Sequence, residues 1–169
     1  MSKNRILILA AGFFLGLGIN QGMAMDPMVR QVNPLIGKKA PVFTLPDLNA
    51  KNNSLDELRA GKNTILFFWA TWCPHCRTQL KEIQANQEQF SSKNVEIVLI
   101  DSGERKEQIV KYLGQLGVTL NVYLDLDGRV SDQYQIIGLP TFVFINRQGV
   151  IAAVEHYLPG NFSDYFIRQ

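Results

Sequence analysis

TILFFWATWCPHC, residues 64–76, joins a continuous apolar run to a pair of cysteines. A run that is apolar on both alternating faces is typical of a strand buried inside a sheet, so residues 64–69 are predicted to form one. Cys73 and Cys76 follow at positions i and i+3, a spacing that brings two sulfurs within disulfide reach on the first turn of a helix. The stretch therefore predicts a strand, a turn, and a helix that begins at the cysteines.

The chain downstream of this stretch alternates between helical and strand patterns. Apolar residues at helical spacing predict two amphipathic helices, the second ended by Gly117; they are Leu80, Ile83 and Phe90, and then Ile109, Leu113 and Leu116. Apolar runs predict further strands at residues 95–100, 141–145 and 150–154. The loop NRQG between the last two favours a hairpin. This order predicts an α/β domain with a parallel core and an antiparallel edge, helices covering both faces of the sheet.

The chain upstream divides into three parts. Residues 1–24 begin with Lys3 and Arg5, continue with an apolar run and end in small residues, a pattern typical of a secretory signal peptide or a retained N-terminal membrane anchor. Residues 25–40 contain prolines and glycine with little periodicity and are predicted to be a linker. The folded domain is expected over residues 41–169, opening with an added hairpin and a short helix capped by Ser54.

The charge balance disfavours one class of partner. The chain carries 17 basic and 15 acidic residues, and Lys3 and Arg5 alone account for the surplus. A nucleic-acid-binding domain normally carries a basic excess, so no nucleic acid is expected as a partner. The export signal places the domain outside the cytoplasmic membrane, periplasmic, either soluble after cleavage or tethered to the inner membrane, where disulfide chemistry is permitted.

The predicted chemistry centres on Cys73. Pro74 suits the first helical turn, where its missing N–H is not needed. The helix N-terminus favours an anion, and a protonated His75 would add to this, so both are expected to lower the pKa of Cys73. Cys73 is the expected attacking sulfur and Cys76, one turn inside, the resolving one. No cofactor beyond this dithiol is predicted.

Other interpretations of the cysteine pair are weaker. A structural disulfide across so short a loop would stabilise the fold little. A metal site lacks a second ligand pair, since His156 is the only other histidine, so no metal ligand is predicted, although a copper or zinc carrier using the same thiols stays an alternative. Covalent haem attachment needs a histidine directly after the second cysteine, and this chain has Arg77 there, so haem attachment is excluded. Peroxide reduction needs an isolated reactive cysteine, which this pair does not offer.

Three segments carry a resemblance to a known family. WCPHC after FFWAT, with GLPTF at residues 138–142, resembles the thioredoxin superfamily. More closely, GKKAPVFTLPDLN, GKNTILFFWATWC and YQIIGLPTFVFINRQGVI are similar to its extracytoplasmic TlpA/ResA-like branch, from about residue 37 to residue 154. The resemblance implies a thioredoxin-like fold in which Pro140 follows a cis peptide bond beside the sulfurs. It also implies that Leu139 pairs with an extended substrate and that Trp72 forms an apolar ledge.

Two positions depart from the family pattern. Thioredoxin has a buried acid where this chain has Phe67, and TlpA/ResA-like reductases often have a glutamate where it has Gln79. A proton acceptor for Cys76 is therefore missing at both places. The dipeptide Pro74–His75, in turn, matches the DsbA-type oxidases, although no room remains for their helical domain.

These observations predict an enzyme, a protein thiol–disulfide oxidoreductase. Its expected partners are cysteine-containing exported proteins and a membrane redox partner that recycles the dithiol. The framework favours a reductase, as in cytochrome c maturation, whereas the CPHC motif favours a DsbA-like thiol oxidase, which remains the alternative.

Overall fold

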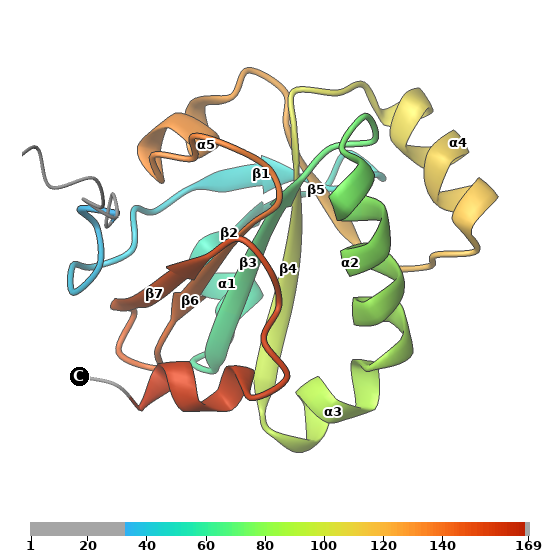
Figure 1. Cartoon of the computed structure of the whole chain (residues 1–169). Coiled ribbons are helices and arrows are strands. Elements are labelled where there is room, and N and C mark those ends of the chain that lie inside the picture. Colours follow the sequence, from blue (N-terminus) through green and yellow to red (C-terminus); the bar gives the residue numbers. More distant parts are fainter. Residues whose placement is uncertain (1–32, 168–169) are drawn as a thin grey trace, which may run out of the picture. The chain divides into compact units, whose positions relative to one another are not determined.

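The computed structural model describes residues 33–167 and is built around a five-stranded mixed sheet with strand order β5-β4-β3-β6-β7 (Figure 1). β3, β4 and β5 run parallel, while β6 pairs antiparallel with both β3 and β7. The sheet strands are β3 (Asn63–Trp69), β4 (Val95–Ser102), β5 (Val122–Asp125), β6 (Thr141–Ile145) and β7 (Ile151–Glu155). The predicted parallel core with an antiparallel edge is confirmed, and β3 lies at its centre.

Alternation along the strands divides the core into two layers, one on each face of the sheet. Phe67 and Trp69 face one layer, and Leu66 and Phe68 face the other. The first layer is covered by α2 (Pro74–Ala85), α3 (Gln87–Ser92), α4 (Lys106–Leu116) and the 3-10 helix η1 (Phe162–Phe166). The second is covered by α1 (Leu55–Arg59) and α5 (Arg129–Gln133). Helices cover both faces, as predicted.

The predicted N-terminal addition is a two-stranded hairpin followed by a helix. β1 (Thr44–Pro46) pairs antiparallel with β2 (Asn52–Ser54). Ser54 caps α1 by accepting from the backbone N–H of Glu57, whose side chain in turn accepts from the N–H of Ser54. Ahead of the hairpin, Gly37 donates to the carbonyl of Ile151 and Ala40 donates to that of Gly149. The chain is therefore tied to the β7 edge before the hairpin begins.

One helix predicted as continuous is interrupted. α2 ends at Ala85, with Asn86 as its C-cap, and Phe90 lies on the separate helix α3. The Asn86 side-chain amide donates to the carbonyl of Glu82 at 2.7 Å, a local bond that competes with the helical backbone pattern. Phe90 still reaches the core, where its ring lies 4.8 Å from that of Phe162.

The N-terminal segment predicted as a signal peptide or anchor lies outside the described residues. Within residues 33–167, the helices are too short or too polar for any of them to cross a bilayer.

Candidate redox-active site

The cysteine pair lies at the junction between β3 and α2, beyond the C-terminal end of the central strand. Cys73 is the N-cap residue of α2, with φ −87° and ψ 108°, and Pro74 occupies the first helical turn. Cys73 and Cys76 form a disulfide with their Cα atoms 5.3 Å apart. The i, i+3 spacing thus places both sulfurs together, as predicted.

The helix N-terminus acts directly on the Cys73 sulfur. The backbone N–H of Cys76 donates to Cys73 Sγ at 3.2 Å, within the limit for a hydrogen bond to sulfur. A thiolate accepts such a bond better than a thiol does, so the reduced form of Cys73 is favoured as an anion. Both cysteines are almost buried, Cys73 at 3% exposed and Cys76 at 0%, and the order of depth agrees with the prediction.

His75 projects from the first turn of α2 into solvent. Replacing it by alanine is expected to make the disulfide less oxidising, because a neighbour that stabilises the Cys73 thiolate is lost when the imidazole carries charge. An exposed charge pair contributes roughly 0.2–1 kcal/mol, so the equilibrium constant with glutathione should change by a factor of about 1.4 to 5 at mildly acidic pH. His75→Lys, which keeps the positive charge, is the control and should retain the wild-type constant. No change in His75→Ala would contradict the assigned effect.

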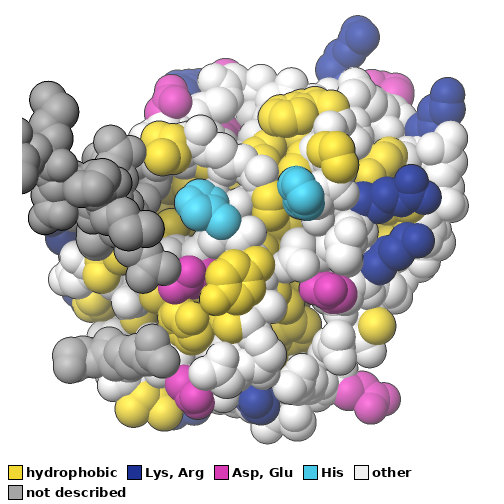
Figure 2. Space-filling view, viewed as in Figure 1, with side chains coloured by type: hydrophobic (Ala, Val, Ile, Leu, Met, Phe, Trp, Pro, Cys, Tyr) yellow, Lys and Arg dark blue, Asp and Glu magenta, His cyan; other side chains and the backbone are white. Residues whose placement is uncertain are grey.

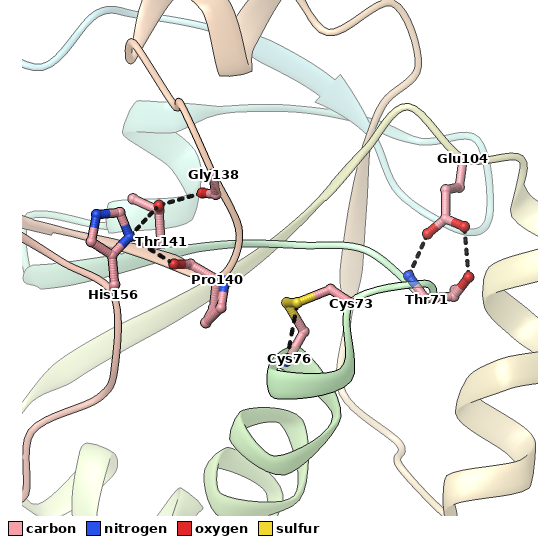
Figure 3. Close-up of a disulfide and its surroundings, with 8 residues drawn as sticks. All are labelled: Thr71, Cys73, Cys76, Glu104, Gly138, Pro140, Thr141 and His156. Carbon is pink, nitrogen blue, oxygen red and sulfur yellow. Dashed lines mark hydrogen bonds between the residues drawn. A yellow bond between two sulfur atoms is a disulfide. The ribbon is translucent and has the colours of Figure 1, made fainter.

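The loop before β6 approaches the disulfide from the other side. The Leu139–Pro140 peptide bond is cis, which confirms the prediction. Figure 3 shows the Pro140 ring on the side of its loop that faces the disulfide. Leu139 is half-buried and packs against the core layer that contains both cysteines. The segments around Cys73 and Pro140, more than 60 residues apart in the sequence, thus meet at one site.

His156 fixes this loop, a role that the sequence did not reveal. Its Nδ1 lies 3.0 Å from the carbonyl oxygen of Pro140 and 3.2 Å from Thr141 Oγ1 (Figure 3). The Thr141 hydroxyl donates to the carbonyl of Gly138 at 2.7 Å, so it accepts from His156, and Nδ1–H is the donor. The sequence did not predict this contact, because nothing in the spacing of His156 links it to Pro140.

Apolar side chains border both segments of the site. Trp72, next to Cys73, is 67% exposed, as the apolar ledge that the resemblance implies would require. Ile137, at the start of the Pro140 loop, is 80% exposed. Figure 2 shows both histidines of the chain on one face, with apolar side chains between and below them. This face offers an apolar surface next to a disulfide.

The two positions that lack the family acids have other contacts here. Phe67 is fully buried and stacks on Phe142, with ring centroids 4.5 Å apart and planes 9° apart. Gln79 accepts from the backbone N–H of Leu158 at 2.8 Å and donates to Glu82 at 2.7 Å. Gln79 therefore ties α2 to the segment after β7, and Glu82 is its hydrogen-bond partner.

A buried pair of carboxyl groups, Asp101 and Glu104, lies behind the turn that leads to Cys73. Glu104 is 7% exposed and accepts from the backbone N–H of Thr71 at 2.5 Å and from its hydroxyl at 2.6 Å (Figure 3). Asp101 is 0% exposed, and burial raises its pKa to about 8, with hydrogen bonding to Glu104 adding to the rise. The only sequence signal for this pair is DSGE directly after an apolar strand.

The AhpC/TSA family profile matches residues 36–154, most of the chain. The chain belongs to the AhpC/TSA family. Among curated proteins it is similar to the thiol-disulfide oxidoreductase ResA of Bacillus subtilis, with 35% identity over 156 residues that cover 91% of this chain and 87% of ResA. The family profile and the similarity to ResA thus cover largely the same part of the chain.

Solved structures support the same assignment. The thioredoxin domain of a thiol-disulfide oxidoreductase from Bacteroides vulgatus matches with a TM-score of 0.66 and 25% identity, covering 76% of this chain and 93% of that domain. StoA from Bacillus subtilis matches with a TM-score of 0.62 and 25% identity, covering 75% of this chain and 96% of StoA. The expected thioredoxin-like fold and the ResA-like resemblance are confirmed, and the relatives are oxidoreductases, as the predicted enzyme class requires.

Proposed function

We propose that this protein is a thiol–disulfide oxidoreductase that reduces disulfides of exported proteins outside the cytoplasmic membrane. The observation that carries the proposal is the Cys73–Cys76 disulfide at the N-terminus of α2, with Cys73 Sγ hydrogen-bonded to the Cys76 N–H. The similarity to ResA supports the same class.

The proposed reaction is a two-step exchange. The Cys73 thiolate attacks one sulfur of the substrate disulfide, forms a mixed disulfide and releases the other substrate sulfur as a thiolate. Cys76 then gives up its proton and attacks Cys73 Sγ, which closes the Cys73–Cys76 disulfide and releases the second substrate thiol. The substrate gains two electrons and the enzyme loses two. A membrane partner must return these electrons for the next turnover.

Substrate is proposed to bind along the Pro140 loop. An extended segment can add to exposed backbone as an extra strand, and Leu139 lies next to Pro140 in the position to receive it. Trp72 and Ile137, both largely exposed, would contact apolar side chains around the substrate cysteine. His156 would keep the loop in place by its bond to the Pro140 carbonyl.

Thiol oxidation is the second candidate. Any group that favours the Cys73 thiolate stabilises the reduced protein and makes the disulfide a stronger oxidant. The Cys76 N–H bond to Cys73 Sγ acts in this sense, and Pro74 and His75 are proposed to do the same. The buried carboxyl pair behind Thr71 acts in the opposite sense, because negative charge near Cys73 disfavours its thiolate.

Metal transport has less support. Among the described residues, no group of three or more histidine, cysteine, aspartate or glutamate side chains is placed to hold a metal ion.

The test combines a trapping variant with the thiol state in cells. Cys76→Ala keeps the attacking sulfur but cannot resolve the mixed disulfide, so exported proteins should accumulate as adducts that dithiothreitol releases. A Cys73→Ala, Cys76→Ala double variant is the control and should trap nothing. In the wild type, acid quenching followed by alkylation should find the pair mainly reduced. Absence of adducts would contradict the exchange reaction, and a mainly oxidised pair would contradict the reducing direction.

A further inference from the structure

Asp101, near the end of β4, is a candidate for the acid that Phe67 and Gln79 do not provide. Asp101 pairs in register with Trp69, the last residue of β3, in a parallel arrangement that puts both side chains on one face of the sheet. Trp69 belongs to the core layer that contains Cys73 and Cys76. Asp101 thus projects on the cysteine side of the sheet, one strand away from the position where thioredoxin-like proteins are expected to carry a buried acid.

Asp101 and Glu104 are bonded into one unit. The backbone N–H of Glu104 donates to Asp101 Oδ1 at 3.0 Å. Asp101 Oδ2 accepts from no donor within residues 33–167, although it is buried. An oxygen that accepts no hydrogen bond is suited to carry a proton, and a protonated Asp101 can donate to the Glu104 carboxylate. Burial therefore favours the neutral, protonated form of Asp101.

Glu104 connects this pair to the active-site turn. Its two oxygens accept from the N–H and the hydroxyl of Thr71, and Gln108 at the start of α4 donates to it as well. Thr71 is two residues before Cys73. A buried carboxylate bonded twice to this turn both fixes its conformation and places a negative charge behind the attacking sulfur.

We propose that Asp101 and Glu104 form a positioning pair for Cys73, in which Glu104 holds the turn through Thr71 and Asp101 takes up a proton when the disulfide is reduced. The inference rests on the proposed function, since it concerns the same cysteines. Reduction by two glutathione thiols yields glutathione disulfide, the Cys73 thiolate, the Cys76 thiol and one proton. Asp101, where it is ionised in the disulfide form, binds that proton because the new thiolate charge favours its neutral state.

The surroundings of Asp101 determine the pH range of this coupling. The charged groups that act on it are Glu104 and Asp125, which lies at the end of β5. Asp125 accepts bonds from the N–H of Val130 and Ser131 and is held as an acceptor. Burial raises the pKa of Asp101 to about 8, and the hydrogen bond to Glu104 and the negative charges of Glu104 and Asp125 add to the rise.

The direct test compares the glutathione equilibrium of the wild type with that of Asp101→Asn between pH 6.5 and pH 9.5. Because the titration of glutathione cancels in the ratio of the two constants, only the enzyme difference remains. The constant for reduction of the wild type, divided by that of Asp101→Asn, is expected to stay level below about pH 7.5. Above that pH it should fall roughly fivefold, because reduction of the wild type then requires an additional proton; a coupling of this size is modest. Asp56→Asn, a change of an exposed carboxylate, is the control and should follow the wild type. A ratio that stays constant over the range would overturn the proposal.

A second variant tests the hold on the turn. Glu104→Gln keeps the length of the side chain but removes the charge behind Cys73, so the pH profile of Cys73 alkylation should move to lower pH by at least about 0.3 unit. A role confined to stability would not lower this midpoint, and an unchanged profile would overturn the assignment. Thr71→Val removes the hydroxyl that bonds to Glu104 and should change the alkylation profile of Cys73, whereas Thr71→Ser keeps the hydroxyl and should leave the wild-type profile unchanged.

Stability measurements distinguish a misfolded variant from a failed inference. The pKa of Asp101 is raised above its unfolded value, so the folded state binds more protons between about pH 4 and pH 8 and loses stability as pH rises through that window. Asp101→Asn should remove this slope in urea unfolding. If the proposed exchange function were wrong, Cys76→Ala would trap no exported proteins, whereas failure of the inference alone leaves the trapped adducts in place and the ratio of the glutathione constants unchanged with pH.

Discussion

Replacing Cys73 by serine is expected to reduce disulfide-exchange activity by at least about 10³-fold, to the level of the uncatalysed reaction. Cys73 is the N-cap of α2 and receives the Cys76 N–H on its sulfur, so it is the thiolate that attacks. A serine hydroxyl stays protonated near neutral pH and cannot take this role. Losses of this size are typical when a nucleophile is removed. Insulin reduction with dithiothreitol as electron donor measures the effect.

The matched variant for this experiment is Cys76→Ser. It should also lose turnover, because the mixed disulfide is not resolved, but it should still form one covalent adduct per molecule with oxidised substrate. Cys73→Ser should form none by the same route. Retained turnover in Cys73→Ser would remove the basis for the proposed reaction.

Replacing Phe67 by alanine is expected to lower the free energy of unfolding by about 3–5 kcal/mol. Phe67 is fully buried on the central strand and stacks on Phe142 of the neighbouring strand at 4.5 Å. Truncation removes this contact and leaves a cavity in the layer beneath the cysteines. Phe67→Leu, which keeps most of the volume, should cost less than about 1.5 kcal/mol. Urea unfolding followed by circular dichroism compares the variants.

The Phe67 experiment also bears on the departure from thioredoxin. If Phe67 were dispensable, alanine would cost less than about 1 kcal/mol, and the position would be free to hold an acid. The stacked geometry predicts the reverse, that this site is committed to core packing. An acidic group on the cysteine side of the sheet must then come from another strand, and Asp101 on β4 is placed there.

The elements that the sequence predicted well are those with long or regular patterns. The strand before Cys73 is apolar at nearly every position, and α4 ends in Gly117 with a positive φ of 66°, as a helix-ending glycine should. β5 is only four residues long, and in residues 118–126 apolar residues alternate with others instead of forming a continuous run, so this strand was not predicted. The break between α2 and α3 depends on one side-chain bond at Asn86, which periodicity does not report.

The site residues divide in the same way. Cys73 and Cys76 were found because their spacing is local, and Pro140 because its segment resembles a family motif. His156, Asp101 and Glu104 come from the ends of other strands and reach the site only through the fold. Pairing of β6 with β7 brings His156 to Pro140, and pairing of β3 with β4 brings Asp101 to Trp69. Sequence spacing carries no trace of these contacts.

The proposed reaction depends above all on Cys73 being the attacking sulfur and Cys76 the resolving one. The most direct measurement is competitive alkylation of the reduced wild-type protein at mildly acidic pH with less than one equivalent of iodoacetamide, followed by peptide mass spectrometry. Cys73 is expected to carry nearly all of the label, because the helix N-terminus stabilises its thiolate while Cys76 stays a buried thiol. Equal labelling of the two cysteines, or preferential labelling of Cys76, would contradict it.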